Sequence, residues 1–331
     1  MKLLENVPRM MWGIDKEVTF AQAVECCLAF SGIGYDYDEL LCASGMAFSL
    51  KWHKGTPCPS AGTVEDPLYM DRLFHYIGCS YKVVWADDAG FGDALDESLD
   101  RGMPVIVQGG FNVPDFYVLA GYDPQGPVYY GRTPFDNTDD YAETGNHPIR
   151  AIIIVDTNED MPSGLAKLYY PLHSAVLAYD REPPQDGHEA NYEHSLEAYD
   201  EWIAQLLNPA LWENVDEEKL NLYVHANEWV FDTLYTSRLA AGRYLLRTAN
   251  FHSRDDSQRI MLAGRMYYVI AKILHQRGFT AFAAGHPEKG FAVKYLRDAD
   301  NRVAWSGILR QAAEQDRRAH EEIAAVVGGR R

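Results

Sequence analysis

The pattern of hydrophobic and polar positions changes character near residue 160. Before that point, short β-branched and aromatic runs alternate with stretches of helical periodicity, which indicates strands and helices within one domain. Helices are expected at residues 19–31, 36–44, 66–77 and 90–101, and strands at residues 80–85, 104–108, 116–122, 128–130 and 149–155. This arrangement predicts an α+β domain with a mostly antiparallel sheet.

After residue 190 the pattern is almost entirely helical. Apolar residues recur at helical spacing, and amphipathic helices are expected at residues 190–207, 215–248, 254–277 and 298–327. The stretch between the two patterns contains four prolines, which favours a linker. The sequence therefore predicts three parts: an α+β domain at residues 1–160, a linker at residues 161–189 and an all-α helical bundle at residues 190–331.

The charge is distributed unevenly over these parts. Residues 1–160 hold 10 Lys+Arg and 25 Asp+Glu, a net charge of -15, whereas residues 161–331 hold 20 and 23, a net charge of -3. The acidic total of -18 argues against a nucleic-acid partner, because phosphate binding needs clustered Lys and Arg, and against an anionic membrane surface. A cleft in the acidic part would attract cations.

Further classes of protein are excluded by what the chain lacks. No run of about 18 apolar residues is present, and the first residues do not resemble a signal peptide, so we expect a cytoplasmic protein without a membrane span. The five cysteines form neither a CxxC motif nor a secreted disulfide pattern. The scattered histidines and the absence of a complete glycine-rich loop lead us to expect no metal and no cofactor.

Separated motifs carry chemical information in the first part of the chain. An expected helix closed by a glycine turn, VTFAQAVECCLAFSGIG, is followed by GMAF. Two neighbouring expected strands read GMPVIV and DFYVLAGYD, and a further one ends in GRTP. The segments lie at residues 18–34, 45–48, 102–107, 115–123 and 131–134.

These motifs resemble the papain-like superfamily of the double-glycine leader peptidase type. They are most similar to the N-terminal domain of butirosin-biosynthesis acyltransferase-like proteins, over about residues 12–155. The resemblance implies a papain-like fold in which a catalytic Cys opens the first helix, a His opens one strand and an Asp precedes a Pro at the end of another. It also implies acyl-transfer chemistry and a carrier protein as partner.

In this chain the three catalytic positions are occupied by Thr19, Asp115 and Thr133. Thr19 stands thirteen residues before the glycine turn of the first motif. A papain-like site needs a thiolate activated by an imidazole, so we do not expect cysteine-protease activity from this set. Cys26 and Cys27, in the middle of the expected helix, are interpreted as structural side chains.

The residues around these positions are expected to line a ligand-binding cleft. Trp12 and Asp15 precede the first helix, and Trp12 offers the aromatic wall that ligand sites commonly use. Tyr117 lies two residues after Asp115 and should point to the same face of a regular strand. Cys42 is expected at the mouth of the cleft.

Three hypotheses about function follow. The first is a degenerate papain-like protein that binds a small cationic or peptidic ligand in a biosynthetic or sensing context. The second is an acyl or peptidyl transferase, or an amide hydrolase, that uses the Thr19 hydroxyl with Asp115 as base or orienting group. The third is an interaction protein whose bundle forms a homodimer while the cleft is vestigial. Selective covalent labelling of an activated nucleophile would distinguish the second from the first.

Overall fold

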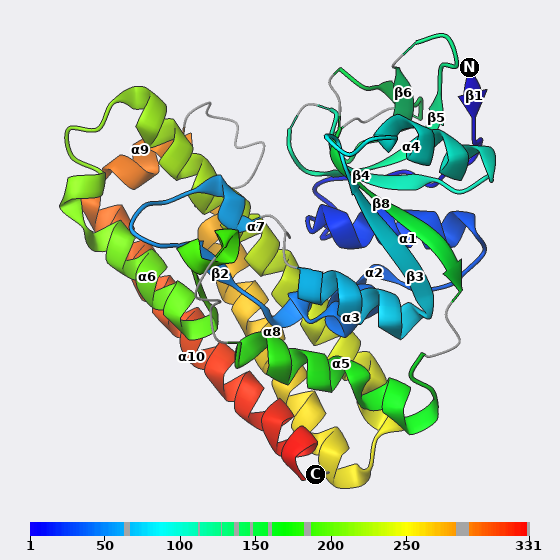
Figure 1. Cartoon of the computed structure of the whole chain (residues 1–331). Helices are drawn as coiled ribbons and strands as arrows, with labels where there is room; N and C mark the ends of the chain where they lie inside the picture. Colours follow the sequence, from blue (N-terminus) through cyan, green and yellow to red (C-terminus); the bar gives the residue numbers. More distant parts are fainter. Residues whose placement is uncertain are drawn as a thin grey trace. The chain divides into compact units, whose positions relative to one another are not determined.

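The computed structural model describes residues 1–62, 67–111, 113–126, 128–135, 139–145, 148–157, 161–181, 187–282 and 291–329. The chain forms two compact units (Figure 1). Unit 1 comprises Met1–Leu40 and Leu73–Pro162, and unit 2 comprises Leu41–Arg72 and Ser163–Arg331. Unit 1 combines a sheet with helices and unit 2 is mainly helical, so the predicted α+β fold with a helical bundle is confirmed.

Among the described residues, unit 1 is built on a seven-stranded antiparallel sheet. Its strands follow the order β3-β8-β4-β5-β6-β7, and β1 pairs with the end of β5. The strands are β1 (Lys2–Leu3), β3 (Cys79–Trp85), β4 (Val105–Gly109), β5 (Phe116–Tyr122), β6 (Tyr129–Arg132), β7 (Ala142–Glu143) and β8 (Pro148–Thr157). β4 and β5 are buried throughout, which explains why they read as nearly continuous apolar runs.

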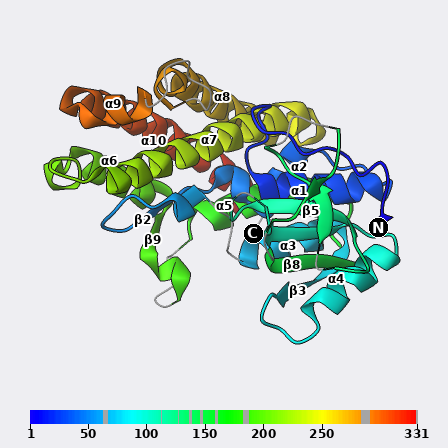
Figure 2. The ribbon, with the colours of Figure 1, turned by 90° about the horizontal axis from the view of Figure 1, so that it is seen from above.

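Helices cover both faces of this sheet (Figure 2). α1 (Thr19–Phe30) packs on β4 and β5, and the Phe20 and Phe116 rings lie 5.1 Å apart. α4 (Phe91–Asp100) covers the other face, where Leu95 shares a core with Tyr117 and Leu119 of β5. Successive side chains of β5 therefore point to opposite faces of the sheet and pack in different cores, as the pleat of a strand requires.

Unit 2 is a bundle of helices, several of them long. They are α5 (Gly164–Tyr179), α6 (Ser195–Leu207), α7 (Glu217–Thr248), α8 (Arg254–Phe282), α9 (Phe291–Arg297) and α10 (Ala299–Gly328). α8 packs against α7 and α10, and α10 also contacts α5 and α6 (Figure 1). The side chains of Asp216 and Asp298 cap the starts of α7 and α10 by accepting backbone hydrogen bonds. Over the described residues, no helix is long and apolar enough to cross a membrane.

The boundaries between the parts differ from the expected ones. Residues 41–72 belong to unit 2, although they lie inside the expected domain 1–160. They include η1 (Met46–Phe48), β2 (Lys51–His53) and η2 (Pro59–Gly62), and β2 pairs with β9 (Tyr192–His194). The boundary between the units falls within α2 (Tyr37–Ser44) and again within α3 (Pro67–Ile77).

The expected linker 161–189 also differs from what the structure contains. Its first half forms α5, a helix of unit 2 that accommodates Pro171. Proline lacks the N–H that a helix interior uses and usually bends or ends a helix, which is why its presence favoured a linker. Residues 182–186 of the expected linker lie outside the described part of the chain.

A buried ion pair lies at the centre of unit 2. Arg238 of α7 donates hydrogen bonds to Asp316 of α10, with Nη2 2.6 Å and Nε 3.0 Å from Oδ2. Tyr199 of α6 donates to the same oxygen at 3.0 Å. Arg238 Nη1 donates to the carbonyl oxygens of Ala47 and Ser49 at 2.9 and 3.0 Å. Arg238 thus ties the inserted segment 41–72 to the helices.

Candidate functional site

Two of the expected catalytic residues meet at the beginning of α1. Thr19 is the first residue of this helix and is buried. The preceding residue, Val18, has no side chain that can cap the helix. The Thr19 hydroxyl donates its hydrogen bond to Asp115, which stands directly before β5. The packing of α1 on β5 therefore brings together two residues that lie 96 positions apart in the chain.

Asp115 is a buried carboxylate whose two oxygens differ in their bonding. Oδ1 accepts hydrogen bonds from the Thr19 hydroxyl and from the Phe116 N–H, the latter at 2.9 Å. Oδ2 is buried and has no hydrogen-bond partner among the described residues. Burial raises the pKa of Asp115 to about 6, and the two hydrogen bonds oppose that shift only in part. Asp115 thus titrates near neutrality and has an oxygen that a ligand donor can use.

Gln22 holds the loop before α1 against the helix. Its side chain accepts a hydrogen bond from Met11 N and donates one to Met11 O, both at 2.9 Å. Asp15 lies in this loop with a φ of 63°, in the left-handed region that few residues adopt. Gln22 was not predicted as a site residue, because a single glutamine inside a helix belongs to no recognisable pattern.

Glu17 is a second buried carboxylate, two residues before Thr19. Its Oε1 accepts a hydrogen bond from Gly13 N at 3.0 Å, whereas Oε2 is buried without a partner in the part of the chain that is described. Burial raises the pKa of Glu17 to about 7, and the negative charge of Asp15 adds to the shift. Glu17 was not predicted either, and its only signal in the sequence is an acidic side chain close to a helix N-terminus.

Trp12 and Thr133 belong to neighbouring segments. Trp12 N donates to Pro134 O at 2.8 Å, and the Trp12 ring lies 5.3 Å from the Phe135 ring. The buried hydroxyl of Thr133 accepts a hydrogen bond from Phe135 N at 3.3 Å. The loop that contains Trp12 therefore lies beside the end of β6, where Thr133 stands. The hydrogen bond between Thr19 and Asp115 is a separate contact.

Tyr117 packs in a different core from the Thr19–Asp115 pair, and Cys42 belongs to the other unit. Tyr117 is fully buried in the core under α4, and its hydroxyl donates to Val113 O at 2.8 Å. Asp115 N also donates to Val113 O, at 2.8 Å, and this turn interrupts strand alternation before Phe116. Asp115 and Tyr117 therefore do not share a face. Cys42 is a fully buried residue of unit 2, whereas Thr19 belongs to unit 1.

The cysteines of α1 are unsuited to nucleophilic chemistry. Cys26 and Cys27 lie in the middle of the helix and are both buried. Burial raises the pKa of the Cys26 thiol to about 12 and the pKa of the Cys27 thiol well above its ordinary value. Because the thiolate is the reactive form, these side chains act as core residues, which agrees with the interpretation from the sequence.

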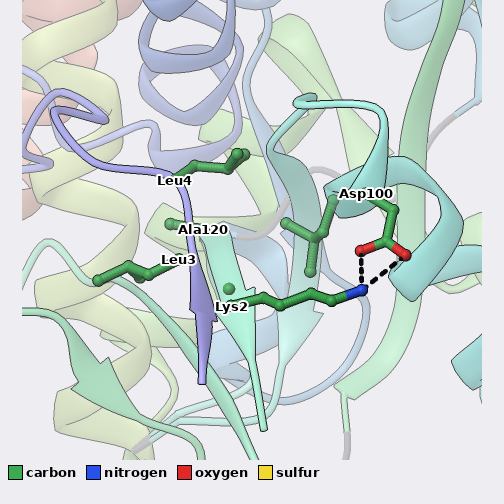
Figure 3. Close-up of a pocket in the computed structure, with 7 residues that line it drawn as sticks. Lys2, Leu3, Leu4, Asp100 and Ala120 are labelled. Carbon is green, nitrogen blue, oxygen red and sulfur yellow. Dashed lines mark hydrogen bonds and ion pairs between the residues drawn. The ribbon is translucent and has the colours of Figure 1, made fainter. Parts of the chain in front are cut away.

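A cavity of about 390 Å³ lies at the other end of β5 (Figure 3). It is lined by Lys2, Leu3, Leu4, Leu99, Asp100, Ala120 and Gly121. Lys2 Nζ and Asp100 form an exposed ion pair at 2.8 Å on its rim. A strand rises about 3.3 Å per residue, so Ala120 lies roughly 16 Å from Asp115 along β5. The cavity is therefore separate from the Thr19–Asp115 pair.

The arrangement at the start of α1 consists of a hydroxyl and a carboxylate in direct contact, with a second buried carboxylate close by in the chain. Among the described residues, no group of three or more His, Cys, Asp or Glu is arranged to hold a metal ion.

No protein-family model matches the chain, and no curated protein matches it. The papain-like relationship remains a prediction from the sequence motifs.

Proposed function

We propose that this chain binds a small amine-bearing or basic peptidic ligand in a biosynthetic or sensing role. The observation that carries this proposal is the unequal bonding of Asp115, whose Oδ2 is buried without a donor while Oδ1 is fixed by Thr19 and Phe116. A ligand ammonium group would donate to Oδ2, and hydrogen bonds between charged groups are the strong ones. The net charge of -15 over residues 1–160 favours approach of a cation.

The neighbouring residues have distinct tasks in this proposal. Thr19 orients the Asp115 carboxylate by donating to Oδ1, which leaves Oδ2 for the ligand. Glu17 adds a second carboxylate at the same end of α1, and Gln22 fixes the loop that carries Trp12. Trp12 would supply an aromatic surface for the apolar part of the ligand.

Calorimetry with amines, aminoglycosides and basic peptides tests this function. Asp115→Asn keeps the shape of the side chain but removes its charge, and should weaken binding by about 1.5–3 kcal/mol, roughly ten- to 150-fold. Asp100→Asn is the matched control, because it removes an equal charge at the other end of β5, and it should change affinity by less than about 0.5 kcal/mol. A panel without any binder, or equal affinities of Asp115→Asn and the unaltered chain, would reject the proposal.

A second candidate function is acyl transfer through the Thr19 hydroxyl. It is favoured by the hydrogen bond that this hydroxyl donates directly to Asp115, because a nucleophile beside a base is the usual arrangement for covalent catalysis. Thr19 Oγ1 would attack the carbonyl carbon of a thioester while its proton passes to Asp115. The carbon–sulfur bond then breaks, the proton moves to the departing thiolate, and the acyl group remains on Thr19 as an ester.

Intact-protein mass spectrometry after incubation with an acyl thioester separates the two candidates. An added acyl mass in the unaltered chain and in Thr19→Ser, together with its loss in Thr19→Val, would establish the transferase. Thr19→Val keeps nearly the shape of threonine and has a methyl group in place of the hydroxyl. An unchanged mass in a chain that binds amines would leave ligand binding as the function.

A further inference from the structure

A second cluster of reactive side chains lies in unit 2, on one face of the ribbon formed by β2 and β9. The strand register sets Lys51 opposite His194 and His53 opposite Tyr192, so these four side chains share a face. The His53 ring meets the Tyr192 ring edge-on at 5.3 Å, and Lys51 Nζ lies 4.5 Å from the centre of the Tyr192 ring. None of these residues takes part in the function proposed above.

A line of hydrogen bonds connects Cys58 to His188 through two hydroxyl groups. Cys58 Sγ lies 2.9 Å from Ser60 Oγ, and Ser60 Oγ lies 2.6 Å from the Tyr192 hydroxyl oxygen. The Tyr192 hydroxyl oxygen lies 3.4 Å from His188 Nε2. With Nε2 as the acceptor, every group along the line donates toward His188. The line therefore begins at a thiol and ends at a base.

The chemistry of the two ends makes a proton shift along this line feasible. Each hydroxyl oxygen on the line can accept one hydrogen bond while it donates another, so a proton can pass from oxygen to oxygen. After such a shift the hydroxyls point the other way, so Ser60 donates to the Cys58 thiolate and stabilises it. Cys58 is also only partly buried, whereas the other four cysteines of the chain are buried. Cys58 is therefore the thiol that a reagent reaches most easily.

The same face of the ribbon holds a buried polar pair that points to a ligand. His194 is 3% exposed, and its Nε2 has no hydrogen-bond partner in the described part of the chain. Glu189 Oε2, 3.9 Å away, is likewise without a hydrogen-bond partner there, while Glu189 Oε1 lies 3.2 Å from Lys51 Nζ. Lys51, Lys54 and Arg181 all exert a positive potential at His194, and the Glu189 carboxylate opposes it in part. The surroundings favour a polar ligand with negative charge.

We propose that Cys58 is a nucleophilic thiol that exchanges with small anionic disulfides. The Cys58 thiolate attacks one sulfur of the disulfide, the sulfur–sulfur bond of the reagent breaks, and a mixed disulfide forms on Cys58. The other half of the reagent leaves as a thiolate. The proton lost by Cys58 passes through Ser60 and Tyr192 to His188, and the imidazolium then returns it to the departing thiolate. Cys58 is oxidised and the departing half is reduced.

The test uses the full chain with oxidised glutathione as the anionic disulfide and cystamine as the cationic one, followed by intact-protein mass spectrometry and peptide mapping. We expect one mixed disulfide per chain, located at Cys58 and absent from Cys58→Ser. Oxidised glutathione should react faster than cystamine. Modification at another cysteine, or faster reaction with cystamine, would overturn the proposal.

The line of hydrogen bonds is tested by Tyr192→Phe, which keeps the ring and removes the hydroxyl. The reaction of Cys58 should slow by about tenfold, because Ser60 loses the hydroxyl that connects it to His188 and the path for the proton is broken. Tyr169→Phe is the matched control, because it removes a tyrosine hydroxyl that donates to Asp256 elsewhere in unit 2, and it should react at the unaltered rate. Equal rates for Tyr192→Phe and the control, with both variants folded by circular dichroism, would refute a role for the line.

Discussion

Burial of Asp115 couples the proposed ligand binding to pH. The pKa of this residue is raised to about 6 by burial, and an ammonium group binds the ionised form. The affinity should therefore be constant above about pH 7 and fall by about tenfold per pH unit below the pKa. Calorimetry between about pH 4.5 and 8, with an amine that stays protonated throughout, measures this profile. Asp115→Asn should lose this tenfold fall and keep only the weaker dependence that Glu17, with a pKa raised to about 7, contributes. A flat profile for the unaltered chain would contradict the assignment.

The same burial has a cost in folding stability. The folded-state pKa of Asp115 lies above its unfolded value, so its destabilising effect is absent at low pH and grows as the pH rises from about 4 through 6. Asp115→Asn should therefore raise the free energy of unfolding by about 2–3 kcal/mol at pH 7 and leave it nearly unchanged at pH 4. Urea unfolding at both pH values measures the difference. If Asp115→Asn lowered the free energy of unfolding equally at both pH values, the loss of the hydrogen bonds of Asp115 would outweigh the removal of its buried charge.

At the scale of single residues, the candidate site was only partly predictable from the sequence. The contact between Thr19 and Asp115 agrees with their motif positions, because the helix start and the strand start are both visible as patterns. Tyr117 was placed on the wrong face because the turn that precedes Phe116 depends on a backbone hydrogen bond that no pattern announces. The importance of Glu17 and Gln22 likewise arises from burial and from partners that the tertiary packing supplies.

Among the elements, β5 and β6 approach so closely that the contact requires glycine. A Cβ atom on Gly131 of β6 would lie 2.5 Å from Val118 O and 3.0 Å from the Phe111 ring. Gly131→Ala should lower the free energy of unfolding by about 1–3 kcal/mol, the usual cost of overpacking. Gly126→Ala is the matched control, since a Cβ there meets nothing within 4 Å, and it should cost less than about 0.5 kcal/mol. Equal effects of the two variants in urea unfolding would contradict this view of the sheet.

The stability of unit 2 should be sensitive to loss of one partner of the buried pair between α7 and α10. Asp316→Asn leaves Arg238 without its counter-charge and should cost about 3–5 kcal/mol. The double variant Arg238→Met with Asp316→Leu should cost less than the sum of the two single changes, because it leaves no unpaired buried charge. A double-mutant cycle in urea measures the coupling. Additive costs would show that the two side chains stabilise the unit independently.

The positions of the helices were easier to predict than the way they group. α7, α8 and α10 lie close to the expected ranges because each buries an apolar stripe of regular spacing. α5 was missed because proline tolerance inside a helix depends on local geometry and not on composition. The membership of residues 41–72 in unit 2 depends on long-range contacts, such as the 4.5 Å stacking of Trp52 on Trp202, that periodicity does not encode.

At the scale of the whole molecule, unit 2 is assembled from two separate stretches of chain. Residues 41–72 contribute side chains to its interior, including Phe48 and Trp52, both fully buried. A fragment of residues 1–162 would expose these side chains, so we expect it to aggregate and to bind a hydrophobic dye. Size-exclusion chromatography and dye fluorescence check this outcome. A soluble, monomeric fragment without dye binding would contradict the assignment of residues 41–72 to unit 2.

This division also determines when the two stretches of unit 2 can first pack together during synthesis. A ribosome completes residue 72 well before it reaches Glu217, where α7 begins, and at about 5–20 residues per second the delay is roughly 7–30 s. During that interval Phe48 has been synthesised, but α7 and Tyr267 of α8, against which it packs, have not. Trp52 lacks its partner Trp202 for most of the same interval. Chaperones that bind nascent chains would bind the segment that contains these two side chains. The yield of folded protein should therefore depend on the speed of translation beyond residue 72 as well as on the stability of the finished fold.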